Sequence, residues 1–339
     1  MASCLLLIFQ GCLLGEYRDD RGVVLGVPGR EGWVMSAPEG TAFIPGGFLI
    51  IGSISQDSAS FVNPPKKVAV SSFYADTTAV YNNQYRQFYE ALLEEASAGT
   101  AQQATEDAAV FTEDFIKENF YPDMSRWQKD FAHQMADPMV EEYYTHVAFD
   151  RFPVVGITWE AARQFAAWRT RYLNKYREEE GLWPMPRFRI PSATEWTHAA
   201  RGGKSLAKYP WGGPYVRDEE GNLLANFKSN RGNYRECKYD YTTPVDYFPP
   251  NGYGLHIGGN VAEWTIDAYN PAATARMWDL NPVYLDEGQP YKVIKGGSWK
   301  DIARFLQTDV VDYEHKDKAR SYIGFRCVMS HIGEEPSLD

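Results

Sequence analysis

The chain has 339 residues, of which 44% are hydrophobic and 15% aromatic, and this composition excludes a disordered protein. Its formal net charge of −11 argues against a nucleic-acid-binding protein, because a phosphate backbone is bound by a clustered basic surface. Abundant tyrosine, tryptophan, glycine and proline favour a turn-rich globular fold packed with aromatic side chains over a helical bundle.

A short apolar run, ASCLLLIFQGC, lies at the start of the chain and ends at Cys12. It has roughly ten residues, whereas a membrane-spanning helix needs about twenty, so it fits the apolar core of a signal peptide. A small residue before a cysteine at this point resembles a bacterial lipobox, in which the cysteine is acylated. We expect a signal-peptide remnant at 1–11, lipidation of Cys12 and a tether at 12–40; the alternative is an incidental or buried cysteine.

Strands are expected at 41–53 and 66–76, where β-branched and aromatic residues alternate partly with polar ones and are broken by glycine and proline. An amphipathic helix is expected after an N-cap at Asn82 or Asn83. Its apolar residues recur at helical spacing and are Tyr85, Phe88, Tyr89 and Leu92.

Two further helices carry clear start signals. Thr158 is the expected N-cap of a helix within 153–174. Ser192 and Glu195 form a capping box within PSATEWTHAARGG, and the following glycine pair supplies the left-handed stop. From residue 204 onward the periodicity is weak, and we expect long ordered loops.

An acidic segment separates the first two helices. From Glu90 to Asp150 there are fourteen acidic residues and three basic ones. We interpret residues from about 90 to about 150 as an insertion whose acidic side chains are either a solvated face or a docking surface for a basic partner. The candidate partner-binding residues are Glu94, Glu95, Glu106, Asp107, Glu141 and Glu142.

Six sequence blocks then resemble, in order and spacing, the formylglycine-generating enzyme or sulfatase-modifying-factor family. They are IPGGFLIIGS, PVVGITWEAARQFAAWR, RIPSATEWTHAARGG, PVDYFPPNGYGLHIGGNVAEWT, KVIKGGSW and GFRCV. The resemblance implies an α+β fold related to C-type lectins, loop-rich with little regular secondary structure. It would occupy residues 41–332, followed by a tail at 333–339.

The resemblance also implies a catalytic site that this chain lacks. Enzymes of the family bind copper through two cysteines that follow the GGSW turn, and soft thiolates select Cu(I). The matching positions here are Asp301 and Leu306. Since a carboxylate and an aliphatic side chain cannot replace two thiolates, we expect no copper and no enzymatic activity. Asp301 is expected to form a structural ion pair with Lys300 or Arg304.

Calcium is the second metal that the resemblance implies. The family motif GN-x-x-EW is matched by Asn260, the carbonyl of Val261, and Glu263, which would supply hard oxygen ligands. Asn226 and, more loosely, Asp240 match a second site. The alternative is that Asn260 and Glu263 only hydrogen-bond to loop amides.

Within the family, the order of lipobox, first helix and acidic insertion resembles gliding-motility and type IX secretion lipoproteins. That resemblance implies a non-enzymatic subunit of a periplasmic ring, tethered to the outer membrane at its periplasmic face. The subunit would self-associate and dock a GldN/PorN-type ring protein. The two alternatives are a metal-dependent oxidase and a calcium-dependent carbohydrate-binding module.

Overall fold

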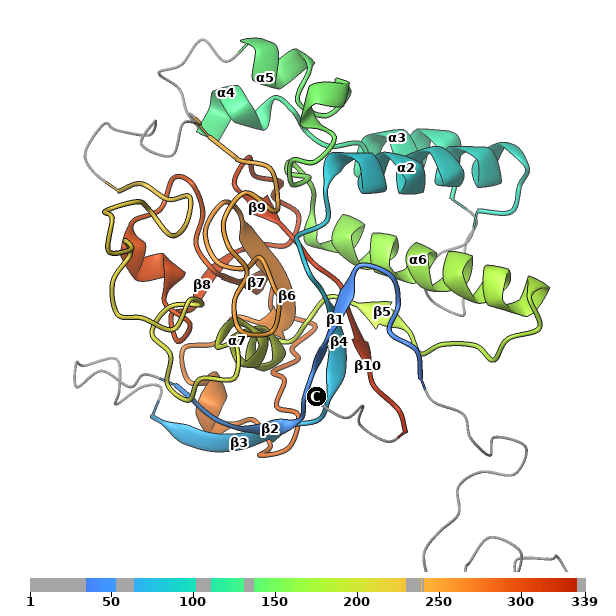
Figure 1. The fold of residues 1–339 in the computed structure, drawn as a ribbon. Helices are drawn as coiled ribbons and strands as arrows, with labels where there is room; N and C mark the ends of the chain where they lie inside the picture. Colours follow the sequence, from blue (N-terminus) through green and yellow to red (C-terminus); the bar gives the residue numbers. More distant parts are fainter. Residues whose placement is uncertain are drawn as a thin grey trace, which may run out of the picture. The chain divides into compact units, whose positions relative to one another are not determined.

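The computed structural model describes residues 35–52, 64–101, 111–130, 137–229, 239 and 241–333 (Figure 1). Residues Ala37–His331 form one compact unit, and Met1–Ser36 with Ile332–Asp339 are grouped as a second. Cys12, Glu106, Asp107 and Asp240 lie outside the described residues, as does most of the expected tether and tail. In the described part of the chain, no helix is both long and apolar enough to cross a membrane.

Three sheets form the β part of the compact unit. The first has the order β1-β4-β10-β5 and consists of Thr41–Ile44, Phe73–Asp76, Val328–Ser330 and Phe188–Arg189. The second pairs β2, Gly47–Ile51, with β3, Lys66–Val70. The third has the order β8-β7-β6-β9 and consists of Asp312–His315, Tyr291–Lys295, Ala262–Ala268 and Ile323–Gly324.

The two expected β segments are confirmed, and each is divided into two strands. β1 and β2 are separated by Pro45 and Gly46, and β3 and β4 by Ser71 and Ser72. β1 pairs with β4, whereas β2 pairs with β3, so the two halves of each segment belong to different sheets. The division lets one continuous stretch of sequence contribute to two sheets.

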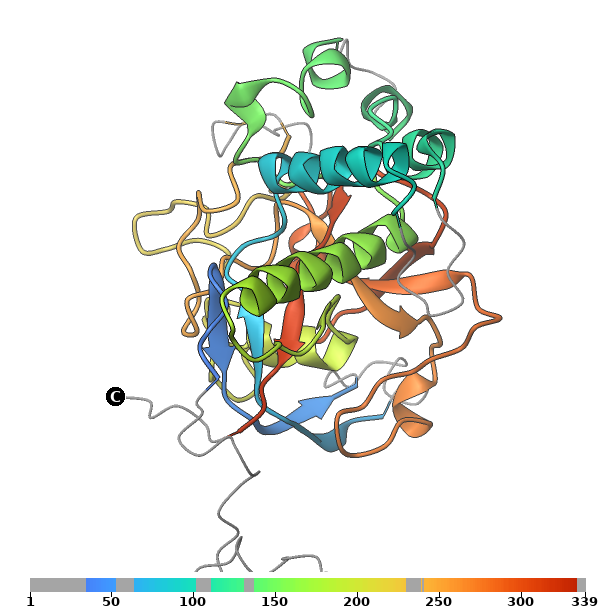
Figure 2. The same ribbon diagram turned by 90° about the vertical axis from the view of Figure 1, so that its right-hand side faces the viewer.

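The long helices are α2, Asn82–Ser97, and α6, Trp159–Glu179, which run alongside each other (Figures 1 and 2). Their apolar faces meet through aromatic rings: Phe165 stacks on Tyr85 at 5.9 Å and contacts Phe88 edge-on at 5.6 Å. Such contacts contribute beyond simple area burial. The periodicity that predicted an amphipathic helix therefore marks its packing face.

The helix caps agree with the sequence at two of three places. Thr158 caps α6 by accepting a hydrogen bond from the Ala161 amide at 3.2 Å. Ser192 and Glu195 form the capping box of α7, Ala193–Ala200. At α2 the N-cap is Tyr81, because the expected cap residue Asn82 is helical and donates its side-chain amide to the carbonyls of Tyr143 and Phe149.

The acidic insertion is folded onto the rest of the unit. Its helices are α3, Glu113–Asn119, α4, Arg126–Asp130, and α5, Asp137–Glu141, followed by the 3-10 turn η1, Val147–Phe149. Its buried side chains include Ile116, Phe120, Trp127, Tyr143 and Tyr144. Figure 1 shows α3 beside α2, with α4 and α5 following over the same end of the molecule. Acidic residues on its surface thus cover an aromatic interior.

The expected fold class is confirmed. Helices and strands are mixed, and between residues 204 and 261 the described residues include no helix and no named strand of a sheet. This loop-rich segment contributes buried aromatic side chains such as Tyr209 and Phe227 to the interior. The loops are ordered by packing rather than by regular hydrogen-bonded ladders.

Candidate functional site

The GGSW turn follows β7 and is shaped by two glycines. Gly296 has φ +94° and Gly297 has φ +65°, a region that other residues rarely adopt. A Cβ atom on Gly297 would lie 2.9 Å from a methyl carbon of Leu306. After the turn, the Trp299 amide donates to the Asn260 carbonyl at 3.0 Å, and its indole donates to the Ser321 carbonyl at 3.2 Å. These bonds fix the turn against the residues just before β6 and β9.

Asp301, the first position matched to a copper-binding cysteine, closes a local turn. Its carboxylate accepts hydrogen bonds from the Ser298 amide at 3.0 Å and the Ser298 hydroxyl at 2.6 Å. The expected ion pair with Lys300 or Arg304 is not among the contacts of the described residues; Lys300 instead lies over the Tyr322 ring at 3.4 Å. Ser298 is the nearer partner because the Asp301 amide also bonds back to its carbonyl.

Leu306, the second matched position, is a core residue. It ends the 3-10 turn η3, Ala303–Leu306, and is fully buried. It belongs to a hydrophobic cluster with Tyr209, Ala225 and Phe227. The cavity beside Gly297 and Asp301 has a volume of about 10 Å³. That is room for about one water molecule. A peptide substrate does not fit beside this turn as it lies.

An aromatic cluster formed by Trp127, Tyr143, Tyr241 and Trp299 packs the acidic insertion onto the tryptophan of the turn. Trp127 of α4 is buried and stacks on Trp299 with ring centroids 6.0 Å apart. Tyr143 and Tyr241 contact Trp127 at 4.9 and 5.4 Å. The acidic insertion therefore packs directly onto the turn. This contact was not predicted from the sequence, although the isolated aromatic residues within the acidic segment were a signal for it.

The loop matched to a calcium site brings two of the expected residues together. Asn260 has φ +66°, and its side-chain oxygen accepts from the Thr243 amide at 2.9 Å and the Asn226 amide group at 3.3 Å. Asn226 also donates to the Tyr241 carbonyl at 2.6 Å. Asn260 thus bonds loop amides, as the alternative interpretation expected.

Glu263 lies in a different set of contacts. Its two carboxylate oxygens each accept from Arg326 at 2.7 Å, and one also accepts from the Trp196 indole at 2.7 Å. Glu263 and Arg326 are both buried. A guanidinium beside the carboxylate occupies the place that a cation would take, so the matched residues do not fit calcium as they lie.

Nor does the described part of the chain hold a cluster of three or more His, Cys, Asp or Glu side chains able to bind a metal ion. Calcium binding stays a prediction. It would require Glu263 to exchange Arg326 for the ion, or Asn226 and Asn260 to bind it with other oxygens.

The candidate docking residues of the insertion lie at its surface. Glu94, Glu141 and Glu142 are exposed. Glu95 is half-buried, with its carboxylate 3.8 Å from Arg171. Exposed acidic side chains of this kind steer a basic partner more than they add binding free energy.

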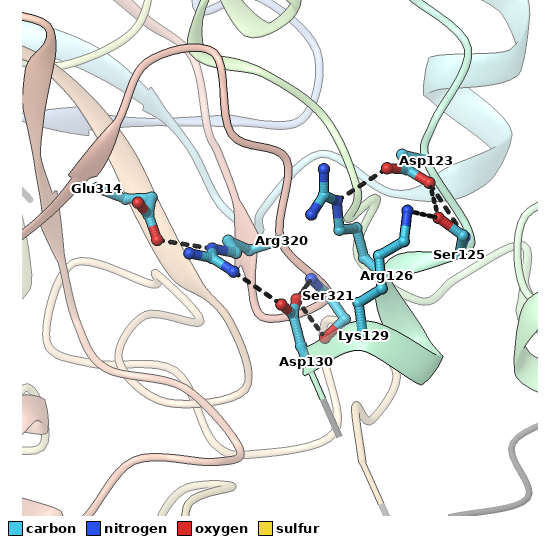
Figure 3. A network of polar contacts seen from close by, with 8 residues as sticks. All are labelled: Asp123, Ser125, Arg126, Lys129, Asp130, Glu314, Arg320 and Ser321. Atoms are coloured by element: carbon cyan, nitrogen blue, oxygen red, sulfur yellow. Dashed lines mark hydrogen bonds and ion pairs between the residues drawn. The ribbon is translucent and has the colours of Figure 1, made fainter. Parts of the chain in front are cut away.

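A polar network attaches α4 to the third sheet (Figure 3). Asp130, the last residue of α4, accepts from the Arg320 guanidinium at 2.9 Å and from the Ser321 amide at 2.9 Å. Arg320 also donates to Glu314 of β8 at 2.6 Å. Burial opposes ionisation of Glu314, but hydrogen bonds led by the one from Arg320 outweigh it and lower the pKa of its carboxyl.

A second group of contacts in Figure 3 organises the turn that precedes α4. Asp123 pairs with the Arg126 guanidinium at 2.8 Å and accepts a hydrogen bond from the Ser125 hydroxyl. Lys129 donates to Ser125 at 2.7 Å. The start and the end of this short helix are therefore both fixed by charged side chains, which holds Trp127 between them on the GGSW turn.

Comparisons with known proteins agree with this architecture. The sequence profile of the sulfatase-modifying factor enzyme 1-like domain matches residues 34–331. The chain is 30% identical over 325 residues to the inactive C-alpha-formylglycine-generating enzyme 2 of Mus musculus, with 88% of this chain and 91% of that protein covered. It is 27% identical over 314 residues to the formylglycine-generating enzyme of Mus musculus, covering 85% and 74%.

Among solved structures, PvdO from Pseudomonas aeruginosa is similar in fold. Its TM-score is 0.55 at 18% sequence identity, and the match covers 86% of this chain and 94% of that one. The profile match spans the whole compact unit, including the GGSW turn and the inserted helices that pack on it. The protein belongs to the sulfatase-modifying-factor family, whose members include formylglycine-generating enzymes and an inactive relative.

Proposed function

We propose that this protein is a non-enzymatic structural lipoprotein of the GldK/PorK type. In this role it is a subunit of the periplasmic ring of the type IX secretion and gliding-motility machinery. Cys12 carries the lipid that tethers it to the periplasmic face of the outer membrane. The folded unit self-associates in the ring and docks a GldN/PorN-type partner.

The observation that carries the non-enzymatic part of the proposal is the closed GGSW turn. Asp301 bonds to Ser298, and Leu306 is buried among aromatic residues, so neither offers a soft ligand for copper. Trp127 covers the turn from outside. The similarity to an inactive formylglycine-generating enzyme 2 agrees with loss of the family's chemistry. A metal-dependent oxidase would need a different site.

A scaffold role is supported by the way the acidic insertion is attached. Asp130 and Arg320 join it to the third sheet, and Trp127 joins it to the GGSW turn. The exposed carboxylates of Glu141 and Glu142 are therefore borne by a segment that is packed on the core. An acidic surface on a rigid support suits a basic protein partner, because complementary charge speeds association.

The carbohydrate-binding alternative is not favoured by the position of Glu263. A calcium-dependent sugar site needs an open ion whose remaining coordination positions take sugar hydroxyls. Glu263 is buried and paired with Arg326, so it is not available at an open surface. No described residue around it offers a replacement carboxylate cluster.

A pull-down from detergent-solubilised membranes tests the proposal. The tagged full chain is isolated, its partners are identified by mass spectrometry, and the particles are viewed by negative-stain microscopy. We expect a stoichiometric basic partner in ring-shaped particles. The variant Cys12→Ser is expected to leave the membrane fraction, because its lipid anchor is lost. A monodisperse monomer without a partner would refute the ring role.

Charge reversal locates the docking surface. The double variant Glu141→Lys, Glu142→Lys reverses two exposed charges of the insertion. We expect most of the partner to be absent from the pull-down with this variant. The matched control reverses Glu178 and Glu179, two exposed acids at the end of α6. If both double variants keep the partner equally, the ring role stands but the insertion is not its docking surface.

A further inference from the structure

A large cavity lies away from the GGSW turn, between α7, β7 and the segments that follow β6 and η3. Its volume is about 630 Å³. This falls in the range of about 300–1,000 Å³ that is typical of small-molecule sites. Its wall combines apolar side chains, including Ile51, Met277 and Val293, with the charged side chains of Arg201 and Lys295. None of the residues that carry the proposed ring role lines it.

Two cations in this wall are buried. Lys295 is 3% exposed, and its ammonium donates to the carbonyls of Thr308 at 2.8 Å and Val310 at 2.7 Å. An ammonium has three N–H groups, so one is left without an oxygen acceptor among the described residues; the Trp196 ring centroid lies 5.4 Å from the ammonium nitrogen. Arg201 is 4% exposed and donates to the Ile50 carbonyl and the Thr308 hydroxyl, which leaves further N–H groups of its guanidinium.

Neither cation forms an ion pair within the described part of the chain. Asp309, which also lines the cavity, attracts both from a longer distance. The carboxylate of Asp267 already accepts hydrogen bonds from the amides of Ala193 and Tyr284. Two buried cations therefore face one uncommitted acid, and a buried charge without a partner is strongly destabilising.

The titration of Lys295 reflects this imbalance. Burial lowers the pKa of its ammonium to about 7, with Arg201 acting in the same direction and Asp309 and Asp267 opposing it. An anion placed against Lys295 would favour the charged ammonium and raise its pKa. Binding of such an anion near pH 8 would therefore take up a proton.

We propose that this cavity binds a small amphipathic monocarboxylate, with the carboxylate at Arg201 and Lys295 and the hydrocarbon part against Met277 and Val293. With Lys295 protonated, the cavity wall carries the three cations Arg201, Lys295 and Arg304 and the two acids Asp267 and Asp309, which leaves about one positive charge for the ligand to neutralise. The remaining wall suits a saturated or branched hydrocarbon group. Such a carboxylate is found in a short fatty acid and at the C-terminus of a peptide, and the two sources are separated by the test below.

Isothermal titration calorimetry of the detergent-solubilised full chain tests the proposal by measuring the affinity for each probe. The probes are octanoate and N-acetyl-leucine, compared with octanol and octylamine, which carry a neutral and a cationic head. We expect one carboxylate to bind at least tenfold more tightly than octanol, and octylamine not to bind. Preference for octanoate or for N-acetyl-leucine identifies the source. Equal binding of octanol and both carboxylates, or no binding at millimolar concentration, would overturn the proposal.

Two variants check that binding occurs in this cavity. Lys295→Met removes the charge and should weaken carboxylate binding at least tenfold, whereas Lys292→Met, at another buried lysine of β7 outside the cavity, should leave it unchanged. Met277→Trp fills the cavity while all charges are retained, so it should also block binding. It keeps the test decisive if Lys295→Met fails to fold. Unchanged affinity in both Lys295→Met and Met277→Trp would refute the site.

Proton uptake provides a readout specific to Lys295. The binding heat measured at pH 8 in phosphate and in Tris should differ, because these buffers release protons with different enthalpies. We expect uptake of part of one proton by the wild type and almost none by Lys295→Met. Identical buffer dependence in the two proteins would contradict the assignment of the carboxylate to Lys295.

Discussion

Replacing Asp130 with asparagine tests whether the acidic insertion is held to the core by charge. The side chain of Asp130 is 4% exposed and that of Arg320 is 24% exposed. Breaking a fully buried ion pair costs about 3–5 kcal/mol. Because Arg320 is partly solvated and keeps its bond to Glu314, we expect the lower value of about 2–3 kcal/mol.

That loss should appear as local opening of the insertion. At about 1.4 kcal/mol for each tenfold change, the open population of α3 and α4 rises by roughly 30- to 150-fold. Hydrogen exchange of these helices, read by mass spectrometry, measures it directly. The matched control is Glu113→Gln, which breaks an exposed pair with Lys117 and should leave hydrogen exchange of α3 and α4 nearly unchanged.

Two results would refute this reasoning. Exchange in the Asp130→Asn protein that matches the wild type within a factor of about two would show that the ion pair does not hold the insertion. An equal increase of exchange throughout the sheets would show that the pair supports the whole unit rather than one segment. Loss of partner binding by Asp130→Asn with the surface carboxylates intact would link this rigidity to the proposed ring role.

Four other outcomes are expected. Glu263→Gln leaves Arg326 buried without its counter-charge and should lower the free energy of unfolding by about 3–5 kcal/mol in urea denaturation. Leu306→Ala should cost about 2–5 kcal/mol in the same assay, because its site is closely packed. Burial raises the pKa of Asp267 to about 6, above its unfolded value, so the native state retains its proton more strongly. Stability should therefore fall as pH rises from about 4 to about 6, by up to about 3 kcal/mol relative to Asp267→Asn. Chelation of calcium by EDTA should shift the melting temperature by less than about 1 °C, because Glu263 is already neutralised by Arg326; a shift of several degrees would show that the loop rearranges around an ion.

The helix boundaries were predictable where the signal is local. Ser192 and Glu195 are three residues apart, and the side chain of each accepts a hydrogen bond from the backbone amide of the other. The capping box can therefore be recognised from four letters of sequence. The cap of α2 was predicted one or two residues too late. Asn82 is a good cap residue in isolation, but its side chain is used by carbonyls about sixty residues further along the chain.

The contacts that define the site were not predictable in the same way. Glu263 and Arg326 are separated by 63 positions, and a match to a calcium motif gives no information about an arginine so distant. Asp301 was expected to pair with a neighbouring cation, yet a hydroxyl and an amide three residues earlier satisfy it. Charge proximity in sequence predicts an ion pair only when no nearer donor competes.

The GGSW turn is shaped by two glycines and is closely packed on two sides. Gly296 and Gly297 have the positive φ angles that shape the turn, and Trp299 bonds to residues just before two neighbouring strands. Leucine at position 306 turns the space behind Gly297 into core, and Trp127 from the insertion covers the outside. Each of these packed side chains stabilises the folded turn by burial. A turn packed on both sides joins the insertion to the core, and this is the property on which the proposed ring role depends.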